Sequence, residues 1–288
     1  LQVTNPVHVA TYGTYVTTPS VSEDKAEIRI MTTLENELKK VQTVSISHLI
    51  LDNQGKIVAK SGTEKTLFEA GQSIKITQNL TLNYPRLWTL EKPELYTLET
   101  TVKANGKVTD LYKTPFGIRT IAFDSEKGFL LNGKQVKLKG MCLHQDAGSL
   151  GTAVLDRSYE RRLEIIKEYG CNAIRCSHNQ PSPEFLDMCD RMGFVVIDEA
   201  FDKWKSGYYE KYFDEWWQRD LENMILRDRN HPSIILWSIG NEVTEAWEQG
   251  NEGIKRAEML RDFVHKLEPS RPVTLAAQNN HRGEFSAV

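Results

Sequence analysis

The strongest constraint on this fold is a change of hydrophobic period near residue 121. Before that point apolar and polar residues alternate in short runs, over 25–34, 41–50, 72–82 and 95–102. A period of two is typical of half-buried β-strands. After that point short apolar runs alternate with stretches that have the 3.6-residue period of helices. The chain is therefore predicted to contain two domains of different class, 1–120 and 121–288.

The first domain is predicted to be an immunoglobulin-like β-sandwich. About seven or eight short strands with regularly spaced turns and no clear helix are typical of that architecture. Turn signals at Asp52–Gly55 and Asn105–Gly106 separate successive runs. This domain contains no cluster of titratable residues that resembles a site, so we expect it to be structural.

The second domain is predicted to begin a TIM (β/α)8 barrel. After a hairpin that turns at Asn132–Gly133, apolar runs begin near 136, 172, 194, 234 and 273. Helical patterns lie between them, over 156–169 behind an Asp or Ser cap, and over 183–192, 212–229 and 252–267. This alternation implies parallel strands joined by helices. Eight such units need roughly 250 residues, but only 288 − 120 = 168 follow the sandwich, so we expect an incomplete barrel from a longer enzyme.

Composition excludes several classes of partner. The net charge of −3 gives no basis for binding nucleic acid, and no apolar run approaches the about 20 residues that a membrane helix needs. No targeting pattern is present, so a soluble protein is expected, and a periplasmic or extracellular location stays open if a signal peptide has been removed. The four cysteines form no CxxC pair, so a zinc or redox site is not expected, and Cys142, Cys171 and Cys176 in or beside apolar runs are expected to be small buried hydrophobes.

The ends of the predicted barrel strands point to an active site, because catalytic side chains of such barrels lie at the carboxyl ends of the strands. Polar residues follow four successive apolar runs there: His144, Arg175 with His178, Asp198–Glu199, and Asn241–Glu242. His144 and Arg175 have simpler explanations by themselves, as a structural histidine and a salt-bridging arginine. Asp198 or Glu199 could cap the next segment or pair with a nearby lysine. Together they predict a rim of ionisable groups.

Glu242 is the most informative residue of this rim. It follows the apolar run 234–239 and is expected to be desolvated, which favours the protonated form that a proton donor to a glycosidic oxygen needs. Asn241 beside it can donate a hydrogen bond to a sugar hydroxyl.

The run 227–242, RDRNHPSIILWSIGNE, resembles the acid/base signature of glycoside hydrolase family 2, the family of β-galactosidases and β-glucuronidases. Segments 139–144, 173–178 and 189–200 resemble further family motifs in the same order. The resemblance implies a role for each of five residues: Glu242 as acid/base, Asn241 at the sugar 2-hydroxyl, Arg175 holding the nucleophile ionised, and His144 and His178 lining the sugar subsite. It also implies a two-step retaining mechanism with two carboxyl groups about 5–5.5 Å apart, and no redox or organic cofactor.

Three departures from the family pattern limit what this chain can do. The nucleophilic glutamate is expected near strand seven, beyond this sequence, and the amino-terminal jelly-roll domain is also expected to be missing. Some β-galactosidases carry a metal-binding Glu-x-His after Asp-Glu-Ala, where this chain has Lys203-Trp204-Lys205. Two cations cannot replace those ligands, so no magnesium site is predicted. Trp204 is expected either to stack on a sugar ring or to pack in the core.

The predicted function is hydrolysis of terminal β-linked sugars, with β-galactosidase as the first choice. β-Glucuronidase and β-mannosidase of the same family are alternatives, and so is a non-catalytic carbohydrate-binding or scaffold relative. With a lone acid/base, this polypeptide alone is expected to be inactive. Its exposed sheet edges and apolar faces predict either self-association or an origin as a piece cut from a larger protein after folding.

Overall fold

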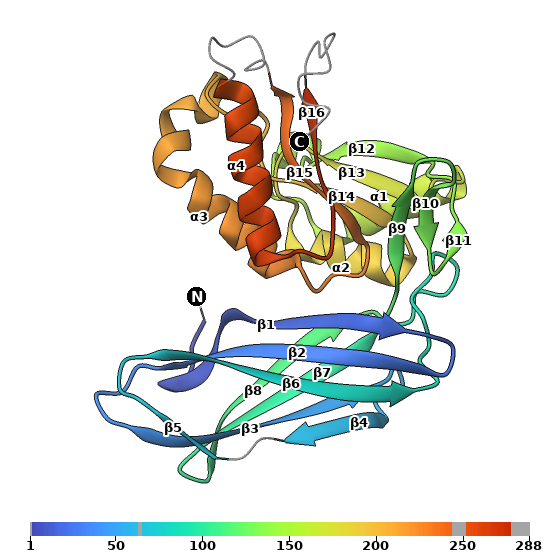
Figure 1. Cartoon of the computed structure of the whole chain (residues 1–288). Helices are drawn as coiled ribbons and strands as arrows, with labels where there is room; N and C mark the ends of the chain where they lie inside the picture. Colours follow the sequence, from blue (N-terminus) through green and yellow to red (C-terminus); the bar gives the residue numbers. More distant parts are fainter. Residues whose placement is uncertain (1, 63–64, 244–251, 278–288) are drawn as a thin grey trace. The chain divides into compact units, whose positions relative to one another are not determined.

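The computed structural model describes residues 2–62, 65–243 and 252–277 (Figure 1). They form two compact units. The first is built on the chain up to Asp124, with 130–134 and 230–232, and the second holds most of the remaining residues. None of the described helices is long and apolar enough to cross a membrane.

The first unit contains two antiparallel sheets (Figure 1). One has the strand order β1-β2-β6, and the other has the order β4-β3-β7-β8, with β5 also paired to β3. The strands are β1 (Val7–Val21), β2 (Lys25–Asn36), β3 (Gln42–Leu51), β4 (Ile57–Gly62), β5 (Thr66–Phe68), β6 (Ser73–Asn83), β7 (Tyr96–Ala104) and β8 (Lys107–Phe116). The predicted β-sandwich is confirmed.

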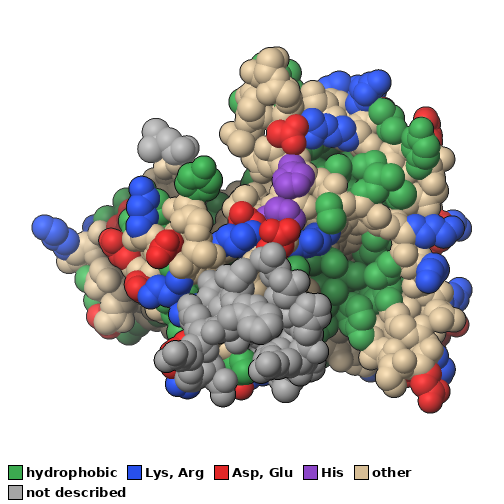
Figure 2. Space-filling model, turned by 90° about the horizontal axis from the view of Figure 1, so that it is seen from above, with side chains coloured by type: hydrophobic (Ala, Val, Ile, Leu, Met, Phe, Trp, Pro, Cys, Tyr) green, Lys and Arg blue, Asp and Glu red, His purple; other side chains and the backbone are tan. Residues whose placement is uncertain are grey.

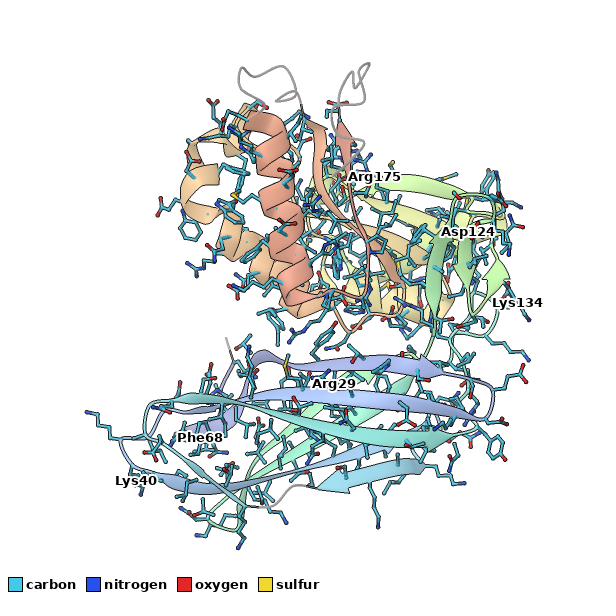
Figure 3. All side chains as sticks on the ribbon, viewed as in Figure 1. Arg29, Lys40, Phe68, Asp124, Lys134 and Arg175 are labelled. Carbon is cyan, nitrogen blue, oxygen red and sulfur yellow. The ribbon has the colours of Figure 1, made fainter. Side chains whose placement is uncertain are left out.

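Strict alternation along the strands builds the core of this unit. Every second side chain of β2, β3 and β7 is buried. Ile28, Ile50 and Leu98 share one buried cluster, and Leu34 and Phe68 belong to a second (Figure 3 labels Phe68). The period of two therefore directs one face of each sheet into the core.

The hairpin turns follow from residues that tolerate a left-handed backbone. Asn105 and Gly106 have φ values of 49° and 82°, and Asn132 and Gly133 have 52° and 74°. Positive φ at both central residues is typical of the tight turns that fit the twist of paired strands. Both predicted turns are confirmed. The second joins β10 (Gly128–Leu131) to β11 (Lys134–Gln135), in a small sheet that also contains β9 (Ile121–Asp124).

His48 is a fully buried histidine in the core of the sandwich. His48 lies with Nε2 3.1 Å from Thr32 Oγ1 and Nδ1 2.6 Å from Gln78 Oε1. Burial lowers the pKa of His48, and the hydrogen bond to Gln78 only partly opposes this effect. Its ring is therefore held neutral and satisfied by two polar neighbours.

The second unit is a parallel sheet whose strands alternate with helices (Figure 1). Its order is β12-β13-β14-β15-β16, and each neighbouring pair is parallel. The strands are β12 (Gly140–His144), β13 (Ala173–Ser177), β14 (Val195–Glu199), β15 (Ile234–Val243) and β16 (Val273–Ala277). The helices are α1 (Asp156–Glu168), α2 (Pro183–Met192), α3 (Glu210–Asp228) and α4 (Glu252–Leu267), with short 3-10 turns η1 (Gly148–Leu150) and η2 (Gly207–Tyr209). This is the predicted partial TIM barrel.

One face of the parallel sheet packs on the helices. Leu163 of α1, Leu186 of α2 and Leu260 of α4 share a buried cluster with Cys176 of β13 and Trp237 of β15. The opposite face is more open. Cys142 of β12 is exposed there, so the expectation that it would be buried is wrong. Its neighbour Leu143 packs against the helical cluster, and alternation turns Cys142 to the other side.

Local capping defines where α2 begins and ends, but it does not define the start of α1. Ser182 caps α2 by accepting a hydrogen bond from the Phe185 N–H, Pro183 fills the first turn, and Gly193 ends the helix in a left-handed conformation. The Asp or Ser cap predicted for α1 is wrong. The capping position is Leu155, which makes no side-chain cap, because Asp156 already lies inside the first turn.

Candidate active site

The five predicted site residues lie at the carboxyl ends of three strands. His144 ends β12, Arg175 lies in β13 with His178 directly after it, and Asn241 and Glu242 lie near the end of β15. Figure 3 marks Arg175 on the parallel sheet. Histidine side chains gather with acidic and basic ones on the face that Figure 2 presents.

Glu199, at the end of β14, is the centre of this arrangement. Its side chain is fully buried. It accepts hydrogen bonds from Arg175 Nε at 3.0 Å and Nη2 at 2.8 Å, and from Ser238 Oγ at 2.6 Å. His178 Nδ1 lies 2.9 Å from its other oxygen. A buried carboxylate with this many partners has a fixed position.

Sequence reasoning placed Glu199 on the rim but gave it no role in the site. From the sequence, its expected role is to cap a segment or to pair with a lysine, whereas its partner in the structure is Arg175. The signal that could have found it is the Asp-Glu pair directly after an apolar strand that lies beside the strand carrying Arg175.

Arg175 also connects Glu199 to Asn241. Arg175 Nη2 donates to Asn241 Oδ1 at 2.8 Å, and Asn241 Nδ2 donates to Asp202 Oδ1 at 2.8 Å. The Asn241 backbone N–H donates to the Asp202 carbonyl at 3.0 Å. The carboxamide is thus held with its oxygen towards a cation and its amino group towards a carboxylate, which defines its orientation.

The two histidines form a pair. The rings of His144 and His178 meet edge to face, with centroids 5.0 Å apart and planes at 87°. His178 is anchored to Glu199, while His144 is exposed. Together they place two imidazole rings side by side at the rim.

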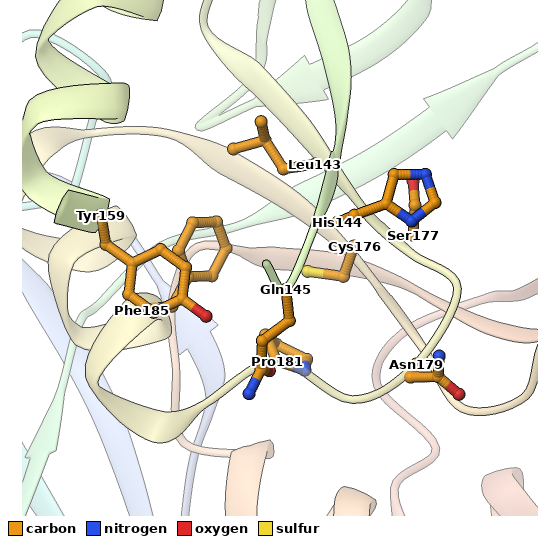
Figure 4. Close-up of a pocket in the computed structure, with 9 residues that line it drawn as sticks. All are labelled: Leu143, His144, Gln145, Tyr159, Cys176, Ser177, Asn179, Pro181 and Phe185. Carbon is orange, nitrogen blue, oxygen red and sulfur yellow. The ribbon is translucent and has the colours of Figure 1, made fainter. Parts of the chain in front are cut away.

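A small cavity lies next to His144 (Figure 4). Its volume is about 10 Å³, room for about one water molecule. It is lined by Leu143, His144, Gln145, Tyr159, Cys176, Ser177, Asn179, Pro181 and Phe185. The cavity is too small to hold a sugar.

Glu242 is exposed, contrary to the expectation that it would be desolvated. Its side chain is 64% accessible, and Oε2 lies 3.2 Å from Lys203 Nζ. Asn241 and Val243 on either side are buried, and the pairing of β15 with β16 is irregular at these positions. Its φ is 47°. A left-handed backbone at a residue other than glycine carries strain, which clusters at functional sites.

The loop after β14 adds two charged residues that sequence reasoning did not assign to the site. Lys203 Nζ lies 2.9 Å from Asp202 Oδ1 as well as 3.2 Å from Glu242. Burial acts to lower the pKa of Lys203, but its hydrogen bonds to the two carboxylates raise it overall. For Asp202, burial acts to raise the pKa, and hydrogen bonds from Asn241 and Lys203 lower it overall. Both side chains are therefore held charged.

Trp204 packs in the core of the second unit. It is fully buried, and its Nε1 donates to the Ile239 carbonyl at 2.6 Å. Of the two alternatives for this residue, packing is the one that the structure shows, because a buried ring cannot stack on a sugar.

Asp198 points away from the rim. It is fully buried, and its pKa is raised by burial and by the charge of nearby Asp228, although Arg227 opposes this. Burial therefore favours the protonated form of this side chain, and we assign it no direct part in the rim.

Comparison with known families identifies the chain. The profile for the TIM barrel domain of glycosyl hydrolases family 2 matches residues 124–287, and a second profile, Glycosyl hydrolases family 2, matches 7–119. The chain belongs to glycoside hydrolase family 2. Its sandwich and its parallel sheet thus correspond to two successive domains of that family.

Individual relatives of the chain support the same family. The chain is 45% identical to beta-galactosidase BoGH2A of Bacteroides ovatus over 98% of its own length and 37% of the relative's. It is 29% identical to a beta-glucuronidase of Bacteroides fragilis, over 98% and 41%. A crystal structure of a glycosyl hydrolase family 2 member from Bacteroides cellulosilyticus superposes with a TM-score of 0.93 at 41% identity, covering 99% of this chain and 37% of that one. The chain thus spans well under half the length of these relatives.

Proposed function

We propose that this chain carries the acid/base half of the active site of a retaining β-glycosidase, and that the whole enzyme is a β-galactosidase. The observation that carries the proposal is the position of Glu242. Its carboxylate is open to solvent at the carboxyl end of β15, beside an Asn241 side chain whose orientation Arg175 and Asp202 define. A proton donor to a glycosidic oxygen needs this access to the substrate.

The proposed mechanism has two steps. In the first, Glu242 gives its proton to the glycosidic oxygen as the bond to the leaving group breaks and a second glutamate, outside this chain, bonds to the anomeric carbon. In the second, the Glu242 carboxylate takes a proton from water as the water displaces that glutamate. Asn241 would hold the 2-hydroxyl, Arg175 would keep the nucleophile ionised, and His144 and His178 would line the sugar subsite.

The charges of the rim favour a neutral sugar over a uronate. Arg175 is paired with Glu199, and Lys203 with Asp202 and Glu242. Neither cation offers an uncompensated charge to a sugar carboxylate. β-Glucuronidase remains a second candidate because the Bacteroides fragilis relative has that activity by name.

The test compares 4-nitrophenyl β-galactoside with the matching β-glucuronide on the full-length enzyme. We expect turnover of the galactoside. Replacing Glu242 by Gln should lower kcat by about 10²–10⁴-fold, and azide should restore turnover while giving a β-glycosyl azide. Turnover of the glucuronide alone would overturn the choice of sugar, and an active Glu242→Gln enzyme would overturn the acid/base assignment.

For the isolated chain we propose no activity and self-association. The open face of the parallel sheet has an apolar hollow of about 210 Å³. Leu138, Met141, Cys142, Ile197 and Ile235 are among its lining residues. An uncovered apolar hollow favours association, and further barrel strands would fill it. A clean monomer in light scattering, or turnover of an aryl β-galactoside by this polypeptide, would contradict this.

A further inference from the structure

One lysine joins two carboxylates at the mouth of the site. Lys203 Nζ lies 2.9 Å from Asp202 Oδ1 and 3.2 Å from Glu242 Oε2. The Lys203 side chain is 22% accessible, whereas Glu242 is 64% accessible. Lys203 is thus the better fixed member of the pair, and Glu242 is the member that reaches towards solvent.

The Lys203 ammonium ends a continuous chain of polar contacts. Glu199 contacts Arg175, Arg175 contacts Asn241, and Asn241 contacts Asp202. Asp202 contacts Lys203, and Lys203 contacts Glu242. Charges alternate in sign along this path, with one neutral carboxamide in the middle. The buried and fully paired Glu199 is therefore connected, contact by contact, to the exposed Glu242.

The backbone on both sides of Lys203 is also fixed by hydrogen bonds and packing. The Asp202 carbonyl accepts a hydrogen bond from Asn241 N at 3.0 Å, and the neighbouring Trp204 is fully buried, with its Nε1 bonded to the Ile239 carbonyl. Both contacts attach the loop to β15, the strand that carries Glu242. The distance between Lys203 and Glu242 is therefore set by the packing of the loop on that strand.

We propose that Lys203 is a positioning residue for Glu242, with Asp202 as its anchor. The Lys203 ammonium holds the Glu242 carboxylate in the orientation from which Glu242 transfers protons. It also compensates the negative charge of Glu242 before this carboxylate accepts a proton from water. This inference rests on the proposed acid/base role of Glu242. Because exposed ion pairs contribute little to folding, its effect should appear in kinetics rather than in stability.

The experiment compares leaving groups in the full-length enzyme. The dinitrophenolate of a 2,4-dinitrophenyl β-galactoside leaves without protonation. The phenolate of a phenyl β-galactoside needs a proton from the acid to leave. For Lys203→Met we expect kcat/KM on the phenyl substrate to fall about tenfold, less than the about 10²-fold that misplacement by 1 Å can cost. On the dinitrophenyl substrate kcat/KM should change less than about threefold, because only proton transfer is impaired.

Two further variants control this result. Lys203→Arg, which keeps the cation, should recover most of the loss. Lys205→Met removes a cation from the same loop that pairs with Asp214 instead, at 2.6 Å, and should behave as wild type. Equal losses of kcat/KM on both substrates, or no loss on either, would overturn the positioning role.

Failure of the acid/base assignment can be distinguished from failure of the inference about Lys203. Wild-type turnover of the galactosides and a steep leaving-group dependence in Glu242→Gln test the acid/base assignment before any lysine variant is considered. If both hold and Lys203→Met shows no leaving-group dependence, only the inference about Lys203 fails.

Discussion

The Arg175 guanidinium lies against the Glu199 carboxylate, with Nε 3.0 Å and Nη2 2.8 Å from the same oxygen. This pair joins the neighbouring strands β13 and β14 at their carboxyl ends. Because Glu199 is fully buried, water cannot take the place of its partners. This ion pair also fixes the positions of two neighbours, because His178 contacts Glu199 and Asn241 contacts Arg175.

Replacing Glu199 by Gln should destabilise the second unit strongly. The change leaves Arg175 without its charged partner, and breaking a buried ion pair costs about 3–5 kcal/mol. Urea-induced unfolding would measure the loss. Ser238→Ala is the matched control: it removes one hydrogen bond to the same carboxylate and should cost about 1 kcal/mol. Equal effects of the two variants would contradict a central role for the ion pair.

Replacing Gly240 by Ala should disturb the site through Trp204. A Cβ at this position would lie 2.8 Å from Trp204 Nε1 and 2.8 Å from Val243 Cγ1, so β15 must shift next to Asn241 and Glu242. We expect a stability loss of about 1–3 kcal/mol and a clear fall in kcat of the full-length enzyme. Gly62→Ala, where a new Cβ meets no atom within 4 Å, should leave kcat unchanged. A Gly240→Ala enzyme with wild-type kcat would count against this packing.

His48 should make the stability of the sandwich depend on pH. Its folded-state pKa is lowered by burial, so below about pH 6.5 the unfolded chain binds a proton that the folded chain does not. This stabilisation is complete above that pH and is lost as the pH falls towards the folded-state value, by at most about 1.4 kcal/mol per pH unit. Unfolding free energies of the wild type and His48→Gln at pH 7.5 and pH 5.5 would test this. The variant should lose less on acidification, and equal losses would show that His48 does not contribute.

Asp198 should act in the opposite direction. Burial and Asp228 raise its folded-state pKa, so above about pH 3.9 the folded protein keeps a proton that the unfolded chain releases. The stability that this gives is complete at acid pH and is lost as the pH rises through the folded-state value. Asp198→Asn removes the dependence, so its stability relative to wild type should increase between pH 4.5 and pH 7.5, by at most about 1.4 kcal/mol per pH unit. Asp262→Asn, at a mostly exposed position, should show no such trend.

The sequence by itself determined the types of element and the membership of the rim. Alternation over 42–51 identifies a strand because each side chain meets core or solvent in turn. Likewise, the amphipathic pattern over 183–192 identifies a helix through side chains a few residues apart. His144, Arg175, His178, Asn241 and Glu242 could be expected together because parallel strands end at one edge of a sheet. All of these are local signals.

The tertiary structure alone decided which face each of these side chains meets. Glu199 and Asp198 are adjacent carboxylates after one apolar run, yet one pairs with Arg175 and the other is buried with a pKa raised by burial and by Asp228. Trp204 lies in the core, one of the two alternatives that the sequence left open, and Glu242 lies in solvent, the reverse of what a carboxylate after an apolar strand suggested. The burial of a side chain and its charged partners depend on segments far away in the sequence, so a local sequence pattern cannot predict them.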